Sequence, residues 1–141
     1  MDLTPVISRL DAMRLRSLLA SDKDRGLNGY FLEEKLNCAT LVDAGDLMSD
    51  RVAVNATVLV REDESNVCWI YSLVLPAHAD VRRGRISVAS SLGAALLGHR
   101  TGDEIDWRVS PGPVRLKIEA VRRRRNKPSQ AISATEWLLL A

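Results

Sequence analysis

Cysteine and histidine are scarce in this chain of 141 residues, which contains two of each. Cys38 and Cys68 do not have the spacing of a metal-binding or redox pair, so we expect two buried free thiols in a reducing cytosol. His78 and His99 have no cysteine pair nearby, which argues against a zinc site. We therefore expect neither a metal nor another cofactor.

Long apolar runs are also missing, and no stretch approaches the roughly 20 residues that a membrane-spanning helix needs. The first residues, MDLTPVISRLD, carry an acid early and no uninterrupted apolar block, so we expect no secretory signal and a cytoplasmic protein. Apolar residues still make up 46% of the chain and charged residues 27%, as in ordinary globular proteins. The length favours one domain with at most a small appendage.

The glycine-rich stretch ISVASSLGAALLGHRTGDEIDW, residues 86–107, does not match a known catalytic or nucleotide-binding loop. Gly93 and Gly98 do not have the dinucleotide-binding spacing, and no glycine–lysine–serine pattern follows them. Ser90 and Ser91 are not in the Gly-x-Ser-x-Gly frame of a nucleophile elbow. We therefore expect a protein that is not an enzyme.

Aromatic residues number six, too few to suggest stacking platforms for unpaired bases. Residues 1–70 carry 8 Lys/Arg and 12 Asp/Glu, a net charge of −4, whereas residues 71–141 carry 12 and 6, a net charge of +6. This asymmetry indicates a charged partner surface without identifying the partner. The candidate nucleic-acid contact is the run Arg122, Arg123, Arg124 and Arg125. A solvated basic loop at a strand end explains that run more simply.

Two amphipathic helices are expected in the first third of the chain. Thr4 and Pro5 suit an N-cap and a first helical position, and an apolar stripe continues to about Ala20. Polar residues then break the helix, and a second helix is expected over about 28–41. Amphipathic helices joined by a short turn predict an antiparallel hairpin, which we assign to residues 1–48.

The pattern changes after residue 48 to the alternation that is typical of β-strands. Strands are expected over 52–60, 67–75, 86–88, 105–109 and 114–120. A short helix is expected over 92–97, with Gly98 as its left-handed cap. The predicted fold class is α+β: a short N-terminal antiparallel helical hairpin, then a mostly antiparallel sheet of about five strands with one short helix. We expect the apolar tail over 133–141 to fold back onto the body, with self-association as the alternative.

The segment ISVASSLGAALLGHRTGDEI resembles the hallmark of the C-terminal domain of the bacterial Gre transcript-cleavage factors, and it is also similar to Rnk, described as a regulator of nucleoside diphosphate kinase. The similarity extends through VAVNATVLVRED and IYSLVLPAHAD upstream and through the PGP turn downstream. The N-terminal LDAMRLRSLLA resembles the short first helix of Rnk more than the long Gre arm. The resemblance implies an FKBP-like sheet domain over 49–141, with a short coiled coil in front.

The resemblance also implies docking on RNA polymerase at the mouth of the secondary channel. The docking residues that it implies are Ala77, His78, Asp80, Ser90, Ser91 and Leu92. The family's Ser-Pro-Leu-Gly is Ser-Ser-Leu-Gly here, and because serine also suits the first turn of a helix, we expect the fold to be kept.

The expected length of the hairpin decides whether its tip can reach the active centre of the polymerase. Gre factors act through a long coiled-coil arm with acidic residues at its tip, whereas each helix here has about 15 residues, a length of roughly 22 Å. Asp22 and Asp24 lie at the expected tip and carry the oxygen ligands that Mg²⁺ prefers, although aspartate is common in turns. We therefore expect a regulator that competes with cleavage factors without stimulating cleavage.

Two other functions stay open at this stage. One is a nucleic-acid- or nucleoside-diphosphate-kinase-linked binding module that uses the basic C-terminal half. The other is a prolyl isomerase, which would need an aromatic-lined pocket that Trp69 and Tyr71, on a strand face expected to be in the core, do not offer.

Overall fold

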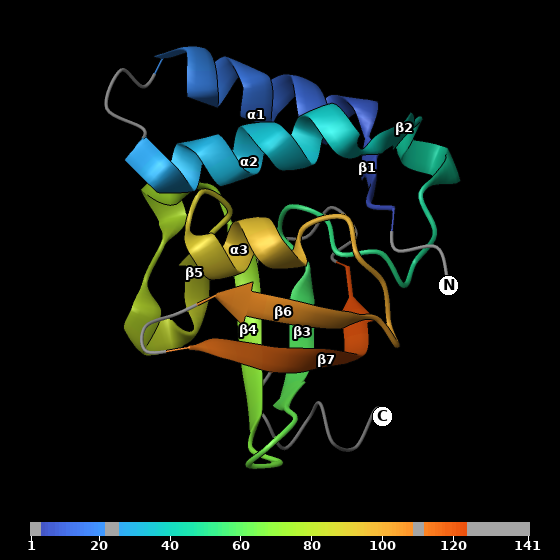
Figure 1. The fold of residues 1–141 in the computed structure, drawn as a ribbon. Coiled ribbons are helices and arrows are strands. Elements are labelled where there is room, and N and C mark those ends of the chain that lie inside the picture. Colours follow the sequence, from blue (N-terminus) through green and yellow to red (C-terminus); the bar gives the residue numbers. More distant parts are fainter. Residues whose placement is uncertain (1–3, 22–25, 109–111, 124–141) are drawn as a thin grey trace.

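The computed structural model describes residues 4–21, 26–108 and 112–123. Two helices, α1 (Arg9–Ser21) and α2 (Gly26–Cys38), lie beside each other above a β-sheet (Figure 1). A shorter helix, α3 (Ser91–Leu96), contacts both α2 and the sheet. The arrangement is a mixed α+β fold, which confirms the predicted class.

The main sheet has five strands in the order β5-β4-β3-β7-β6. These strands are β3 (Thr57–Glu62), β4 (Cys68–Val74), β5 (Arg85–Ser87), β6 (Glu104–Arg108) and β7 (Pro113–Arg122). The β3 strand pairs antiparallel with β4 and β7, and β6 pairs antiparallel with β7, whereas β5 runs parallel to β4. The expected mostly antiparallel sheet is therefore confirmed.

The amino-terminal segment differs from the prediction. Strand β1 (Val6–Ser8) pairs in parallel with β2 (Thr40–Val42), so α1 begins at Arg9 rather than at Pro5. The Ser8 hydroxyl oxygen accepts a hydrogen bond from the Asp11 N–H at 3.1 Å and caps α1. Residues 40–42 are used in β2, so the second helix ends before them. A strand of three residues is too short to show a periodic pattern in the sequence. Only the pairing of β1 with β2 in the folded chain defines them as strands.

The alternating segment over 52–60 joins the main sheet only in its second half, from Thr57 onward. The Val52 N–H donates to the His99 carbonyl at 2.8 Å, and the Val52 carbonyl accepts from the Gly98 N–H at 2.9 Å, so this part pairs with the loop after α3. Asn55 has a φ of 72°, a left-handed conformation that interrupts an extended strand. The single alternating segment in the sequence therefore forms two separate parts, one paired with the loop after α3 and one paired within the main sheet.

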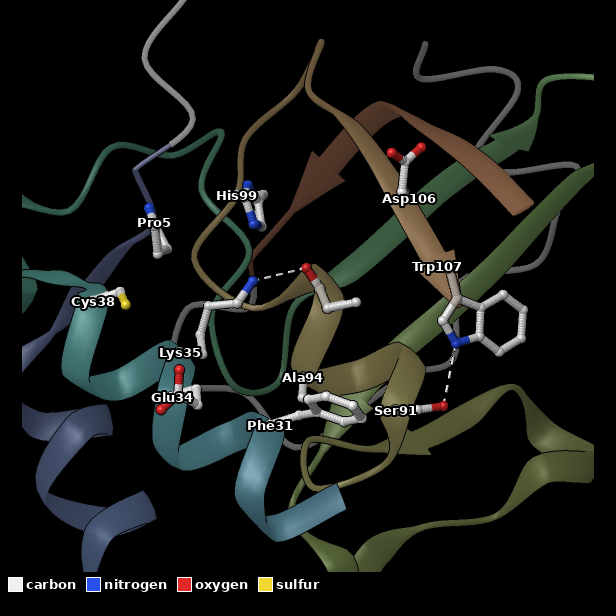
Figure 2. A pocket seen from close by; sticks show the side chains of 11 residues that line it. Pro5, Phe31, Glu34, Lys35, Cys38, Ser91, Ala94, His99, Asp106 and Trp107 are labelled. Atoms are coloured by element: carbon white, nitrogen blue, oxygen red, sulfur yellow. Dashed lines mark hydrogen bonds between the residues drawn. The ribbon is translucent and has the colours of Figure 1, made fainter. Parts of the chain in front are cut away.

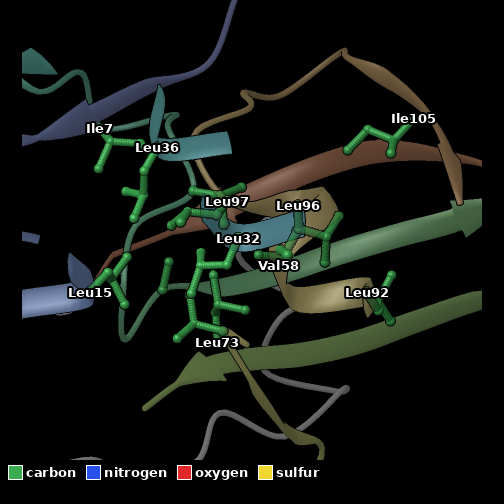
Figure 3. Close-up of a cluster of buried hydrophobic side chains, with 14 of the residues drawn as sticks. Ile7, Leu15, Leu32, Leu36, Val58, Leu73, Leu92, Leu96, Leu97 and Ile105 are labelled. Carbon is green, nitrogen blue, oxygen red and sulfur yellow. The ribbon is translucent and has the colours of Figure 1, made fainter. Parts of the chain in front are cut away.

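One hydrophobic core joins the helices to the sheet (Figure 3). Leu15 of α1 and Leu32 of α2 are fully buried in the same cluster as Leu73 of β4 and Leu96 of α3. The described residues on the two sides of residue 48 share this core. The division of the chain into two domains at that residue therefore stays a prediction. Within residues 4–21, 26–108 and 112–123, no helix is both long and apolar enough to cross a membrane.

Both cysteines are exposed, so the expectation of buried thiols is wrong. Cys38 is the last residue of α2 and Cys68 is the first of β4, and at these ends the chain leaves the core. Trp69 is 49% exposed, so its predicted place in the core is also wrong. Several predicted features lie outside the described residues, namely Asp22, Asp24, Arg124, Arg125 and the tail over 133–141.

Candidate functional site

The first predicted docking group lies in the loop between β4 and β5, which contains two short 3-10 helices. Ala77 and His78 are exposed. The Asp80 carboxylate accepts a hydrogen bond from the Arg82 N–H at 3.2 Å and lies 3.6 Å from Arg83 Nε. Asp80 therefore shapes the loop, while Ala77 and His78 are free to meet a partner.

Val81, in the same loop, was not among the residues predicted from the sequence. Its side chain is 84% exposed, the highest value among the large exposed apolar residues of the described chain. Arg82 and Arg83 beside it are exposed as well. A branched apolar side chain next to two cations suits a contact with an acidic protein surface. The signal in the sequence was a valine in a loop, away from any alternating strand.

The second predicted docking group consists of Ser90, Ser91 and Leu92, and each of these residues has a different role. Ser90 caps α3, because its hydroxyl oxygen accepts a hydrogen bond from the Gly93 N–H at 3.1 Å. The Ser91 hydroxyl accepts from Trp107 Nε1 at 3.2 Å. Leu92 is only 6% exposed and packs in the core, so its assignment to the docking surface is wrong. Helix α3 lies on the sheet and turns this leucine inward.

The structure places the two predicted groups at opposite ends of β5. Asp80 pairs with Arg85, the first residue of β5, through two backbone hydrogen bonds of 2.9 Å. Ser90 follows Ser87, the last residue of β5, and caps the next helix. A strand of three residues is only about 10 Å long, so both groups border one edge of the sheet.

The described part of the arginine run does not favour a nucleic-acid interface. Arg122 is exposed, but Arg123 Nη2 donates a hydrogen bond to the Leu47 carbonyl at 2.7 Å. This hydrogen bond connects the end of β7 to the segment before β3.

Within the described part of the chain, no three His, Cys, Asp or Glu side chains lie close enough together to form a metal site.

A pocket of about 440 Å³ lies between α2, α3 and β6 (Figure 2). Its walls are mainly apolar, and several charged or polar groups line it as well. The lining residues include Phe31, Glu34, Lys35, Ala95, Asp106 and Trp107. These residues come from segments far apart in the sequence, so no local motif pointed to the pocket.

Lys35 is the cationic side chain of this pocket. Its Nζ donates a hydrogen bond to the Ala95 carbonyl oxygen at 2.9 Å and so joins α2 to α3. Burial lowers the pKa of Lys35 from 10.5 to about 8, although the charges of Asp103 and Cys38 act in the opposite direction. The pocket therefore holds an amine that loses its proton far more easily than an ordinary lysine.

His99 lies beside Lys35 and pairs with the buried Asp103, at 3.2 Å between Nδ1 and Oδ2. Burial and the charge of Lys35 lower the pKa of His99 to about 4, while the hydrogen bond to Asp103 opposes them. The imidazole is therefore uncharged at neutral pH, and its Nδ1–H donates to the carboxylate, which cannot donate. Asp103 Oδ2 also accepts from the Arg100 N–H at 3.1 Å, which fixes the loop between α3 and β6.

The sequence also matches a known family. The family described as "Transcription elongation factor, GreA/GreB, C-term" matches residues 47–123, which contain the whole five-stranded sheet, α3 and both predicted docking groups. The chain belongs to this family. The resemblance to the Gre factors is thereby confirmed, while the similarity to Rnk stays a prediction.

Curated relatives give the same result for the Gre domain. The transcription elongation factor GreA of Rhodospirillum rubrum is 36% identical over 91 residues, which are 64% of this chain and 58% of that protein. GreA of Sphingopyxis alaskensis is 44% identical over 82 residues, which are 57% of this chain and 51% of that protein. The chain thus spans little more than half the length of these two relatives.

A solved structure resembles more of the chain than the Gre domain alone. It is described as prokaryotic transcription elongation factor GreA/GreB from Nitrosomonas europaea, with 34% identity and a TM-score of 0.72. The match covers 86% of this chain and 99% of that one. It therefore extends beyond residues 47–123.

Proposed function

We propose that this Gre-family chain is an RNA polymerase-binding transcription regulator that docks at the rim of the secondary channel and does not stimulate transcript cleavage. Family membership supports the polymerase as partner. The observation that carries the absence of cleavage is the length of α1 and α2, since 13 residues each give helices of about 20 Å. In this proposal the two helices act as a short antiparallel hairpin, too short to place a tip residue deep inside the channel.

Competition follows from the same geometry. A protein that occupies the entrance blocks a longer factor that must pass through it, even though its own tip stays outside. The proposed docking surface is the loop over 76–83, where Ala77, His78 and Val81 are exposed. The exposed arginines of this loop favour an acidic patch on the polymerase, because unlike charges speed and orient the encounter.

The cleavage test measures RNA length in backtracked polymerase complexes. We expect micromolar protein to leave the RNA at full length and to slow the cleavage that an added Gre cleavage factor produces. Shortening of the RNA by this chain alone would contradict the proposal.

The docking test compares two exposed valines. Val81→Asp introduces a like charge toward an acidic partner, and we expect at least a ten-fold weaker retention of the polymerase core. Val67→Asp is the matched control, because Val67 is also exposed but lies in the turn between β3 and β4. Equal retention of both variants would remove the loop from the docking surface, while failure of the unaltered chain to retain polymerase would remove the partner itself.

A further inference from the structure

None of the residues that line the pocket between α2, α3 and β6 belongs to the loop over 76–83. We propose that this pocket is a modification site, in which small, uncharged, apolar aldehydes enter and form an imine with Lys35. This inference goes beyond the proposed function and does not depend on it, because it concerns an amine outside the loop over 76–83.

The position of the amine supports the proposal. Lys35 lines the pocket, and its side chain crosses toward α3, where the Ala95 carbonyl accepts the hydrogen bond from Nζ (Figure 2). Among the described residues, no carboxylate forms an ion pair with this ammonium. When the amine is neutral it still donates to Ala95, and its lone pair is free to attack a carbonyl carbon.

The titratable groups around Lys35 lie on α2, on β6 and in the loop between α3 and β6. Glu34 and Cys38 lie on α2, His99 and Asp103 belong to the loop after α3, and Asp106 lies on β6. Burial outweighs them and lowers the pKa of this lysine to about 8. At pH 7.5 about a quarter of the amine is then unprotonated, against roughly 0.1% for an ordinary lysine. The neutral, nucleophilic form of the amine is therefore strongly enriched over that of an ordinary lysine.

The lining of the pocket selects the class of reagent. Phe31 and Trp107 offer flat apolar surfaces, and the volume of about 440 Å³ has room for a single aromatic ring. Glu34 is an exposed carboxylate on the same pocket and repels anions, whereas the charge of Asp106 is paired with Arg115, at 3.2 Å between Oδ1 and Nε. The fitting electrophile is thus a neutral, ring-bearing aldehyde rather than an acyl phosphate or an aldehyde with a carboxylate.

The chemical step needs no oxidant or reductant. Nζ bonds to the aldehyde carbon, and the resulting carbinolamine loses water, so that a C=N bond replaces the C=O bond. The carbonyl oxygen leaves with the two hydrogens of the neutral amine.

Benzaldehyde with cyanoborohydride tests the proposal on the unaltered protein, because reduction converts the imine into a stable secondary amine that peptide mass spectrometry locates. We expect Lys35 to be labelled at least ten-fold faster than Lys117, which lies on β7 outside the pocket, at pH 7.5. The labelling rate of Lys35 should rise with pH around a midpoint near 8, and its preference should vanish in urea. Equal rates in the folded protein, or a preference that persists in urea, would overturn the proposal.

Two further comparisons test the selectivity. With 4-carboxybenzaldehyde the preference for Lys35 should fall at least three-fold, because the carboxylate of Glu34 repels the anion. Phe31→Ser should lower the preference for benzaldehyde, and since Phe31 is 42% exposed the variant is expected to fold, as circular dichroism would check. An unchanged preference in both comparisons would show that the pocket does not select the reagent and would overturn the assignment of its ligand class.

Discussion

Gly93 is the residue that allows α3 to lie directly on the sheet. A Cβ at this position would collide with the Ser87 carbonyl of β5, which is backbone and cannot turn away. We expect Gly93→Ala to lower the free energy of unfolding by about 1–3 kcal/mol, the usual cost of overpacking. Gly45→Ala is the control, because no atom lies within 4 Å of the added Cβ, and it should change stability by less than about 1 kcal/mol. Equal urea midpoints for the two variants would contradict this view of the contact.

His99 makes the fold sensitive to acid. Its pKa is lowered from 6.5 to about 4, so as the pH falls through this window the unfolded state binds the proton first and the folded state loses stability. The loss should approach about 3 kcal/mol between pH 7 and 4. In His99→Asn the side-chain amide can still donate to Asp103 but does not titrate, so urea unfolding should show a weaker pH dependence. Parallel pH curves for the two proteins would exclude His99 as the source.

At the scale of elements, α3 shows how a cap fixes a helix start. Ser90 is the N-cap with an extended φ of −70° and ψ of 161°, and Ser91 is the first helical residue. Proline fits at that position, because its missing N–H has no partner there and the residue before it is already extended. We expect Ser91→Pro to keep the unfolding free energy within about 1 kcal/mol, whereas Ser90→Ala loses about 1 kcal/mol with the cap.

The emission of Trp107 provides a second measurement on the same variant, since Ser91 is the acceptor of its indole N–H. Its fluorescence should shift in Ser91→Pro even though the stability is nearly unchanged. A large drop in stability would show that the serine does more than fill the first turn.

Helices and strands were predicted correctly where a local sequence signal defines them. The strand over 67–75 and the helix over 92–97 agree with β4 and α3 to within one residue at each end, because alternation and capping are local properties. Prediction failed at β1, where Thr4 and Pro5 suggested a helix start. The pairing of β1 with β2, more than 30 residues away, overrides that local preference.

At the scale of the whole molecule, the helices and the sheet depend on each other. Ile7, Leu15 and Leu32 belong to the same buried cluster as Leu96 and Leu97. The Val6 N–H also donates to the Gly98 carbonyl at 2.9 Å, which ties β1 to the loop after α3. We expect a chain without residues 1–42 to lose cooperative unfolding and to expose apolar surface, as urea titration and dye binding would measure. A sharp, cooperative transition in that fragment would instead support two independent units.

The candidate site was predictable only in part. Family resemblance predicted that Ala77, His78 and Leu92 contact a partner. Ala77 and His78 are exposed, but Leu92 is buried, because its burial depends on how α3 lies on the sheet. The pocket around Lys35 could not be found from the sequence. Lys35 lines the pocket together with Ala95 and Trp107, and these residues are close to it only in the folded chain.

The sequence by itself determined the class of fold, the order of its main elements and the family, because periodicity, caps and a long motif are all encoded in neighbouring residues. Tertiary structure alone decided where α1 begins, which of the predicted docking residues are exposed, and that Lys35 lies in an apolar pocket. Burial and long-range pairing depend on residues that are distant in the chain, and they change both the conformation and the pKa of a residue without any sign in its local sequence.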